Sequence, residues 1–163
     1  MKTRNAIATM IALTALLLTA ACTGQSPTPT EGAKDESGHA MTVYHDPQCG
    51  CCGKWVEHMQ ANGFEVETVP TSDMNRVKRE LGVPRDLPSC HTARVGDYVI
   101  EGHVPAEDVL RLLAEKPDAA GLSVPGMPIG SPGMEAGERR MAYDVILFDD
   151  DETSVFNHYP EIE

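Results

Sequence analysis

Basic residues are scarce in this sequence. Its 163 residues include 13 Lys and Arg against 25 Asp and Glu, which gives a formal net charge of -12. Nucleic-acid binding needs a basic face, so this charge disfavours a nucleic-acid partner. The acidity serves solubility and is compatible with export and with attracting cations. The sequence also lacks a phosphate-binding loop, a dinucleotide fingerprint, a serine nucleophile elbow and a paired-carboxylate site, so none of these chemistries is indicated.

A hydrophobic run long enough to span a bilayer is also missing. The apolar stretch at residues 7–18 is shorter than the ~20 residues that a membrane-spanning helix requires. Lys2 and Arg4 precede this stretch and form a positively charged start. Residues 1–22 therefore predict a secretion signal, which is removed from the folded protein.

Cys22 is the predicted lipidation site. Small residues stand directly before it, as in a bacterial lipoprotein cleavage site, although Thr19 occupies a position where leucine is usual. The alternative is ordinary signal cleavage near Ala21. Thr23 replaces the aspartate that retains lipoproteins at the inner membrane, which favours the outer membrane in a Gram-negative cell. Residues 23–40 are rich in Pro, Gly, Ser and Thr and predict a flexible linker to a domain at 41–163.

Three cysteines stand within four residues, at Cys49, Cys51 and Cys52. No packing requirement calls for such a cluster. Cys49 and Cys52 have the Cys-x-x-Cys spacing, and a predicted helix start nearby would stabilise their thiolates. Three interpretations stay open: soft-metal binding, dithiol redox chemistry by Cys49 and Cys52, and a structural disulfide to Cys90.

For the metal interpretation, copper is the expected ion. Neighbouring cysteines point in different directions, so three thiolates in this spacing bridge several ions more readily than they surround one. Soft thiolates favour Cu(I), with Zn(II) as a competitor. Cys90 is the predicted fourth thiolate ligand, and the alternative for Cys90 is a small buried apolar side chain.

The predicted fold is α/β, with the order strand, helix, strand, helix, strand, strand, helix. Periodicity and turn residues place these elements at 42–45, 53–61, 64–69, 75–81, 92–95, 98–101 and 106–116. A loop rich in Pro, Gly and Met is expected at 117–140, followed by a hairpin with strands at 143–148 and 153–156. With a Cys-x-x-Cys motif after the first strand, this is the element order of thioredoxin-like folds. In such a fold, the loop that carries Cys90 abuts the cysteine helix.

Histidines and methionines complete the set of candidate ligands. His91 follows Cys90 directly, and His103 stands at a predicted strand–helix junction. Met127 and Met134 lie in two Pro-Gly-Met repeats, and thioether sulfur suits Cu(I). The alternatives are a structural role for the histidines and hydrophobic plugs for the methionines. We expect His39, His45, His58 and His158 at the surface, and Trp55 and Met59 in the core.

Four motifs in this order resemble the CopG-type family of periplasmic metal-binding proteins, long classified as a domain of unknown function. They are Cys-Gly-Cys-Cys-Gly-Lys-Trp (49–55), Ser-Cys-His-Thr-Ala (89–93), Glu-Gly-His-Val-Pro-Ala (101–106) and the Pro/Gly/Met-rich segment 121–135. The resemblance implies a thioredoxin-like fold, a periplasmic location and a role in copper resistance. It also implies a multinuclear Cu(I) centre with redox function at Cys49, Cys51, Cys52 and Cys90, with His91, His103, Met127 and Met134 as further motif positions.

The function that we predict is that of an exported copper-binding protein that sequesters copper or changes its oxidation state. One alternative is a metal-independent thiol–disulfide oxidoreductase that uses Cys49 and Cys52. The other is a chaperone that hands copper to a periplasmic efflux pump or oxidase. Contact with the membrane is expected only through a lipid on Cys22.

Overall fold

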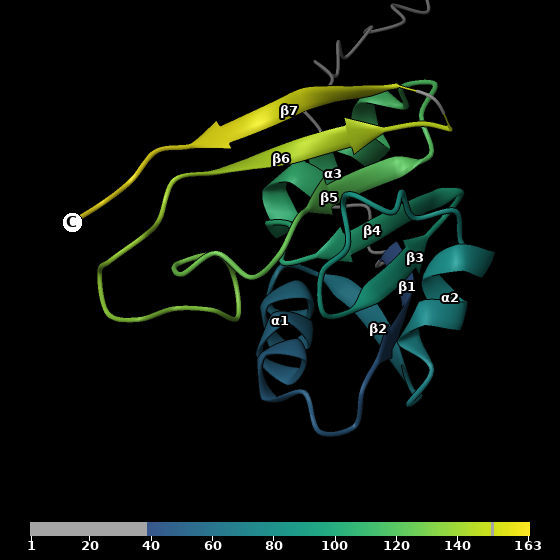
Figure 1. Cartoon of the computed structure of the whole chain (residues 1–163), viewed down its shortest axis with the longest axis horizontal. Helices are drawn as coiled ribbons and strands as arrows, with labels where there is room; N and C mark the ends of the chain where they lie inside the picture. Colours follow the sequence, from purple (N-terminus) through teal and green to yellow (C-terminus); the bar gives the residue numbers. More distant parts are fainter. Residues whose placement is uncertain (1–38, 151) are drawn as a thin grey trace, which may run out of the picture. The chain divides into compact units, whose positions relative to one another are not determined.

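A seven-stranded sheet with three helices forms the part of the chain that the computed structural model describes, residues 39–150 and 152–163 (Figure 1). The predicted signal peptide, Cys22 and residues 23–38 of the predicted linker lie outside this part. Within it, no helix is long and apolar enough to cross a membrane.

The strands follow the spatial order β2-β1-β3-β4-β5-β6-β7. β1 is parallel to β2, β4 is parallel to β5, and the other neighbours are antiparallel. The bounds are β1 (His39–His45), α1 (Gly50–Ala61), β2 (Phe64–Pro70), α2 (Met74–Glu80), β3 (Thr92–Val95), β4 (Tyr98–Gly102), α3 (Ala106–Glu115), β5 (Gly121–Val124), β6 (Tyr143–Phe148) and β7 (Thr153–Tyr159). The α/β class is thereby confirmed, while the thioredoxin-like assignment stays a prediction from element order.

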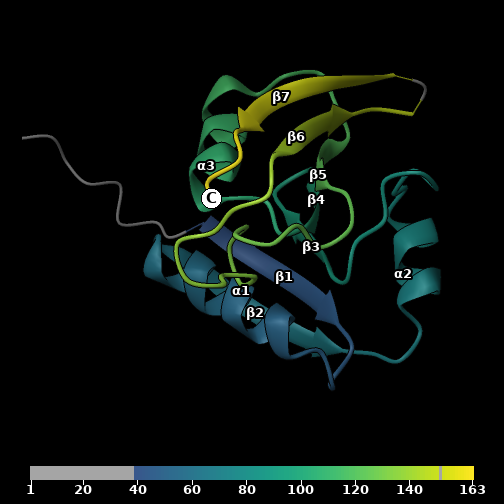
Figure 2. The same cartoon turned by 60° about the vertical axis from the view of Figure 1, so that its left-hand side comes forward.

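Helices cover both faces of the sheet. Figure 2 shows α1 and α3 on one face and α2 on the other. α1 buries Cys52, Trp55, Val56 and Met59, a spacing that gives a helix one apolar side. This side shares an apolar cluster with Val109 and other residues of α3, so the predicted core positions of Trp55 and Met59 are confirmed.

α1 begins earlier than the sequence predicts. The expected start was residue 53, but the helix runs from Gly50, with Cys49 as its N-cap residue. Glycine destabilises helix interiors, so the helix was expected to start at Gly53. The first turn of a helix tolerates glycine, and Gly50 and Gly53 both lie there. The consequence is that Cys51 and Cys52 both belong to the first helical turn.

β5 corrects the predicted loop at 117–140. This strand is fully buried and lies between β4 and β6, so the C-terminal hairpin extends the main sheet. A side chain at Gly121 would put its Cβ 1.9 Å from the carbonyl oxygen of Val99, so only glycine permits this pairing. The strand has only four residues before Pro125-Gly126, so it is too short to show a periodic pattern.

Candidate metal centre

Three cysteines stand at the N-terminal end of α1. Cys49 caps the helix without a side-chain hydrogen bond, and it forms a disulfide with Cys52, which is fully buried. Cys51 is a free, half-buried thiol, and its sulfur lies 3.4 Å from that of Cys49. The structure therefore contains the dithiol pair of the Cys-x-x-Cys motif in its oxidised form.

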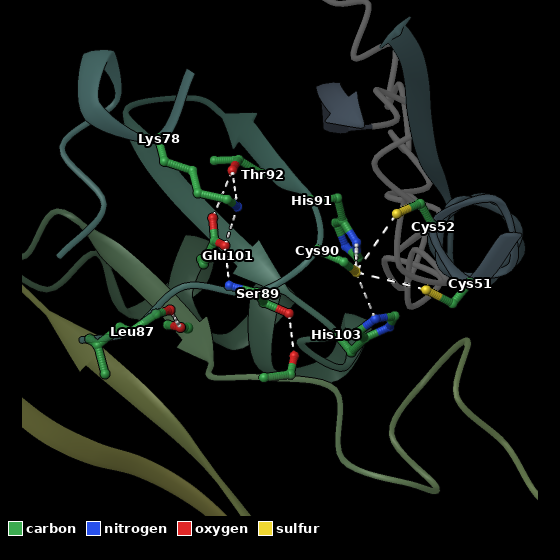
Figure 3. A network of polar contacts seen from close by, with 12 residues as sticks. Cys51, Cys52, Lys78, Leu87, Ser89, Cys90, His91, Thr92, Glu101 and His103 are labelled. Carbon is green, nitrogen blue, oxygen red and sulfur yellow. Dashed lines mark hydrogen bonds and ion pairs between the residues drawn. The ribbon is translucent and has the colours of Figure 1, made fainter. Parts of the chain in front are cut away.

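Cys90 reaches the same point from the segment that precedes β3. Its sulfur lies 3.8 Å from the Cys51 sulfur and 3.7 Å from the Cys52 sulfur (Figure 3). The sulfur atoms of all four cysteines are within 4.8 Å of one another. The chain thus brings together the four cysteines that the sequence proposed as ligands. The predicted alternative of a disulfide to Cys90 is not the one formed, since Cys90 is free.

Two histidines contact Cys90 on its other side. The Cys90 sulfur lies 3.1 Å from His91 Nδ1 and 3.0 Å from His103 Nε2. His103 Nδ1 donates to the carbonyl oxygen of Pro132 at 2.7 Å, and a carbonyl can only accept. In the neutral ring, Nε2 therefore carries the lone pair and faces Cys90. This is the tautomer that binds a metal through Nε2.

Burial keeps this part of the site uncharged. It raises the pKa of the Cys90 thiol to about 12, and the nearby Cys51 adds to the effect. Burial also lowers the pKa of His103, and it lowers that of His91 still further. Without a metal, Cys90 is therefore a thiol and both imidazoles are neutral at pH 7.

His91 is packed tightly between aromatic rings. Its centroid lies 4.4 Å from that of Trp55 and 4.9 Å from that of His103, which it meets edge-on. Within the described residues, His91 Nε2 and Arg111 Nε are the buried side-chain nitrogens that lack a hydrogen-bond partner. His91 thus presents Nδ1 to Cys90 and holds a second nitrogen without a partner among the described residues.

The Pro/Gly/Met-rich segment covers the start of α1 with its backbone. Gly133, at φ 85°, lies so close to α1 that an added Cβ would be 2.8 Å from the Cys51 carbonyl oxygen and 2.9 Å from the Trp55 nitrogen. Met134 is half-buried in this segment, whereas Met127 is 53% exposed. The ligand roles of these two methionines remain predictions.

Comparison with known proteins places this geometry in a family. Two solved structures of the copper resistance protein CopG, forms 1 and 2, match with 47% identity and a TM-score of 0.72. Each match covers 76% of this chain, with 99% of the form 2 chain and 98% of the form 1 chain. The chain belongs to the CopG family. The family resemblance inferred from the four motifs is thereby confirmed.

A family model described as a protein of unknown function, DUF411, matches residues 87–134 of this CopG family member. That range contains Cys90, His91 and His103 but ends before the hairpin and begins after α1. A search among curated proteins found no match.

The structural roles of three side chains near the site were not predicted from the sequence of this CopG family member. Glu101 and Lys78 form a buried ion pair behind Cys90. His58, expected at the surface, is half-buried instead, because its Nε2 accepts the backbone N–H of Ala106 at 3.0 Å and caps α3. The sequence contained one signal for Glu101. It stands two residues after Val99 and therefore on the same face of β4, so a charged side chain is predicted beside a buried apolar one.

Proposed function

We propose that this protein binds copper, as Cu(I), through the thiolates of Cys49, Cys51, Cys52 and Cys90, and that it contributes to copper resistance. The observation that carries the proposal is the convergence of four cysteine sulfurs within 4.8 Å. Thiolates are soft ligands that prefer Cu(I). The copper resistance protein CopG, at 47% identity, supports copper as the ion.

Several copper ions per chain fit this donor set better than one. Cys49, Cys51 and Cys52 come from adjoining positions on one helix end, while Cys90 adds a sulfur from the opposite side. Bridging thiolates would let each sulfur serve two ions. His91 and His103 offer nitrogen donors beside Cys90. One ligand atom from each of these three residues lies within 4.8 Å of the other two.

The Cys49–Cys52 disulfide makes copper binding depend on reduction. A metal ligand must be a thiolate, so these two sulfurs bind only after the disulfide takes up two electrons. In the reverse direction, oxidation of two thiolates to a disulfide releases two electrons, enough to reduce two Cu(II) to two Cu(I). The site therefore combines a copper ligand set with the electrons to change the oxidation state of copper.

The decisive experiment is an anaerobic titration of the fully reduced protein with Cu(I) against a competing chelator, with bound metal counted by elemental analysis. We expect more than one copper per chain and loss of most binding in the Cys51→Ser/Cys52→Ser variant. A wild-type copper count in that variant would refute the cluster. A single transferable copper would indicate the chaperone alternative.

A metal-independent thiol–disulfide oxidoreductase is the second candidate, and the disulfide at the start of α1 favours it. It predicts reduction of a disulfide substrate at a rate that neither copper chelators nor Cys51→Ser change. The copper proposal predicts that Cys51→Ser weakens metal binding, so one variant distinguishes the two.

For location, we propose export to the periplasm and attachment to the membrane through a lipid on Cys22. The support is the signal-like sequence of residues 1–22 and the CopG relationship. Metabolic labelling with palmitate should mark the wild-type protein and fail to mark Cys22→Ser. Equal labelling of both would refute the anchor.

A further inference from the structure

A single buried carboxylate holds both sides of the Cys90–His91 pair. Glu101 on β4 has no exposed surface. Its Oε1 accepts the backbone N–H of Ser89 at 2.6 Å, and its Oε2 accepts the hydroxyl of Thr92 at 2.7 Å (Figure 3). Ser89 precedes Cys90 and Thr92 follows His91, so one side chain fixes the two ends of the ligand segment.

Lys78 holds this carboxylate from the other direction. Its ammonium group comes from α2, forms an ion pair with Glu101 Oε1 and donates to the hydroxyl of Thr92 at 3.0 Å. Lys78 is itself 9% exposed. Burial costs both charges their hydration, which offsets much of the attraction between them. The hydrogen bonds of Glu101 to Ser89 and Thr92 are therefore the contacts through which this pair acts on the ligand segment.

The end of β4 also contacts the ligand segment through the residues after Glu101. The N–H of Gly102 donates to the carbonyl oxygen of His91 at 3.0 Å, and His103 Nε2 lies 3.0 Å from the Cys90 sulfur. Three consecutive residues, the last two of β4 and His103 directly after it, thus hold the two-residue segment by its flanks, its backbone and its sulfur. Such preorganisation limits the ordering that a ligand must impose on binding.

We propose that Glu101, held by Lys78, is a positioning residue that fixes the Cys90 sulfur against the cysteines of α1 before copper binds. This inference rests on the proposed copper function. Outer-shell partners of this kind orient the ligands of metal sites, and their loss weakens metal binding.

Two double variants separate positioning from charge. Lys78→Met/Glu101→Gln removes both charges but keeps a carbonyl oxygen for the Ser89 N–H and an amide for the Thr92 hydroxyl. Lys78→Met/Glu101→Leu removes the same charges and these hydrogen bonds. We expect the leucine variant to bind Cu(I) about 10- to 100-fold more weakly than the glutamine variant, the range typical of lost outer-shell partners.

A core variant controls for lost stability. Val145 is fully buried on β6, two strands from β4. Val145→Ala should lower stability through a cavity and leave the Cu(I) affinity unchanged. Equal affinities in the two double variants would overturn the proposal, and so would a Val145→Ala variant that loses as much affinity as the leucine variant.

A readout without copper tests the same positioning. In the oxidised protein Cys51 and Cys90 are the free thiols of the described chain. Their alkylation by iodoacetamide at one pH, mapped by peptide mass, gives a Cys90-to-Cys51 rate ratio. We expect this ratio to be several-fold higher in the leucine variant than in the glutamine variant. An unchanged ratio in both would refute positioning, whereas absent copper binding by the wild type would refute the proposed function alone.

Discussion

The sulfur of Cys90 lies 3.7 Å from that of Cys52, although the two residues are 38 positions apart in the chain. This contact joins the segment before β3 to the first turn of α1. If copper binds both sulfurs, Cys90 contributes a ligand from outside α1, and the cysteines of α1 cannot substitute for it.

Cys90→Ser should therefore weaken Cu(I) binding by more than the roughly 10- to 100-fold typical of a lost outer-shell partner, or reduce the copper count per chain. Serine is nearly isosteric, so far-UV circular dichroism should stay unchanged. Chelator competition measures the affinity. Wild-type affinity and count in this variant would restrict the site to the cysteines of α1.

His103 connects the metal centre to the Pro/Gly/Met-rich segment through its two ring nitrogens. His103→Asn keeps an N–H donor near the Pro132 carbonyl but loses the nitrogen that faces Cys90, whereas His103→Ala loses both. We expect both variants to bind Cu(I) more weakly and only His103→Ala to lose amide-exchange protection at residues 129–134. Wild-type copper affinity in both variants would exclude His103 as a ligand.

The sequence predicted which cysteines lie together better than it predicted their surroundings. Cys49, Cys51 and Cys52 are adjacent in the chain, so a strand–helix junction alone brings them together, and the element order was enough to direct Cys90 toward them. Lys78 on α2 and Glu101 on β4 are 23 residues apart, and their contact depends on how α2 packs against the sheet, which no local pattern specifies. β5 was missed because its pairing with β4 requires Gly121 to lie close to the Val99 backbone. This is a tertiary contact that the local sequence does not reveal.

The close contact of Gly133 with α1 predicts a specific sensitivity. Gly133→Ala would place a methyl group 2.8 Å from the Cys51 carbonyl oxygen, in addition to the strain of its positive φ. Gly137 also has a positive φ, but no atom of the described residues lies within 4 Å of an added Cβ there, so Gly137→Ala is the matched control.

We expect Gly137→Ala to cost about 1–3 kcal/mol of unfolding free energy, the range for local backbone strain, and Gly133→Ala to cost more. Only Gly133→Ala should change the alkylation rate of Cys51, because only that methyl group displaces the segment from α1. Urea denaturation and mapped alkylation measure the two effects. Identical behaviour of the two variants would show that the segment does not pack on the cysteine turn.

His58 makes the junction of α1 and α3 sensitive to acid. Its Nε2 accepts the Ala106 N–H, so the neutral ring caps α3, and burial lowers the pKa of His58. The unfolded chain therefore binds this proton first, and stability falls as the pH drops through the unfolded value of about 6.5. His58→Gln should lose this share of the pH dependence between pH 7.5 and 5, while the share from His91 and His103 remains. Urea unfolding at each pH measures the difference, and a His58 pKa above 6.5 by NMR would contradict the capping role.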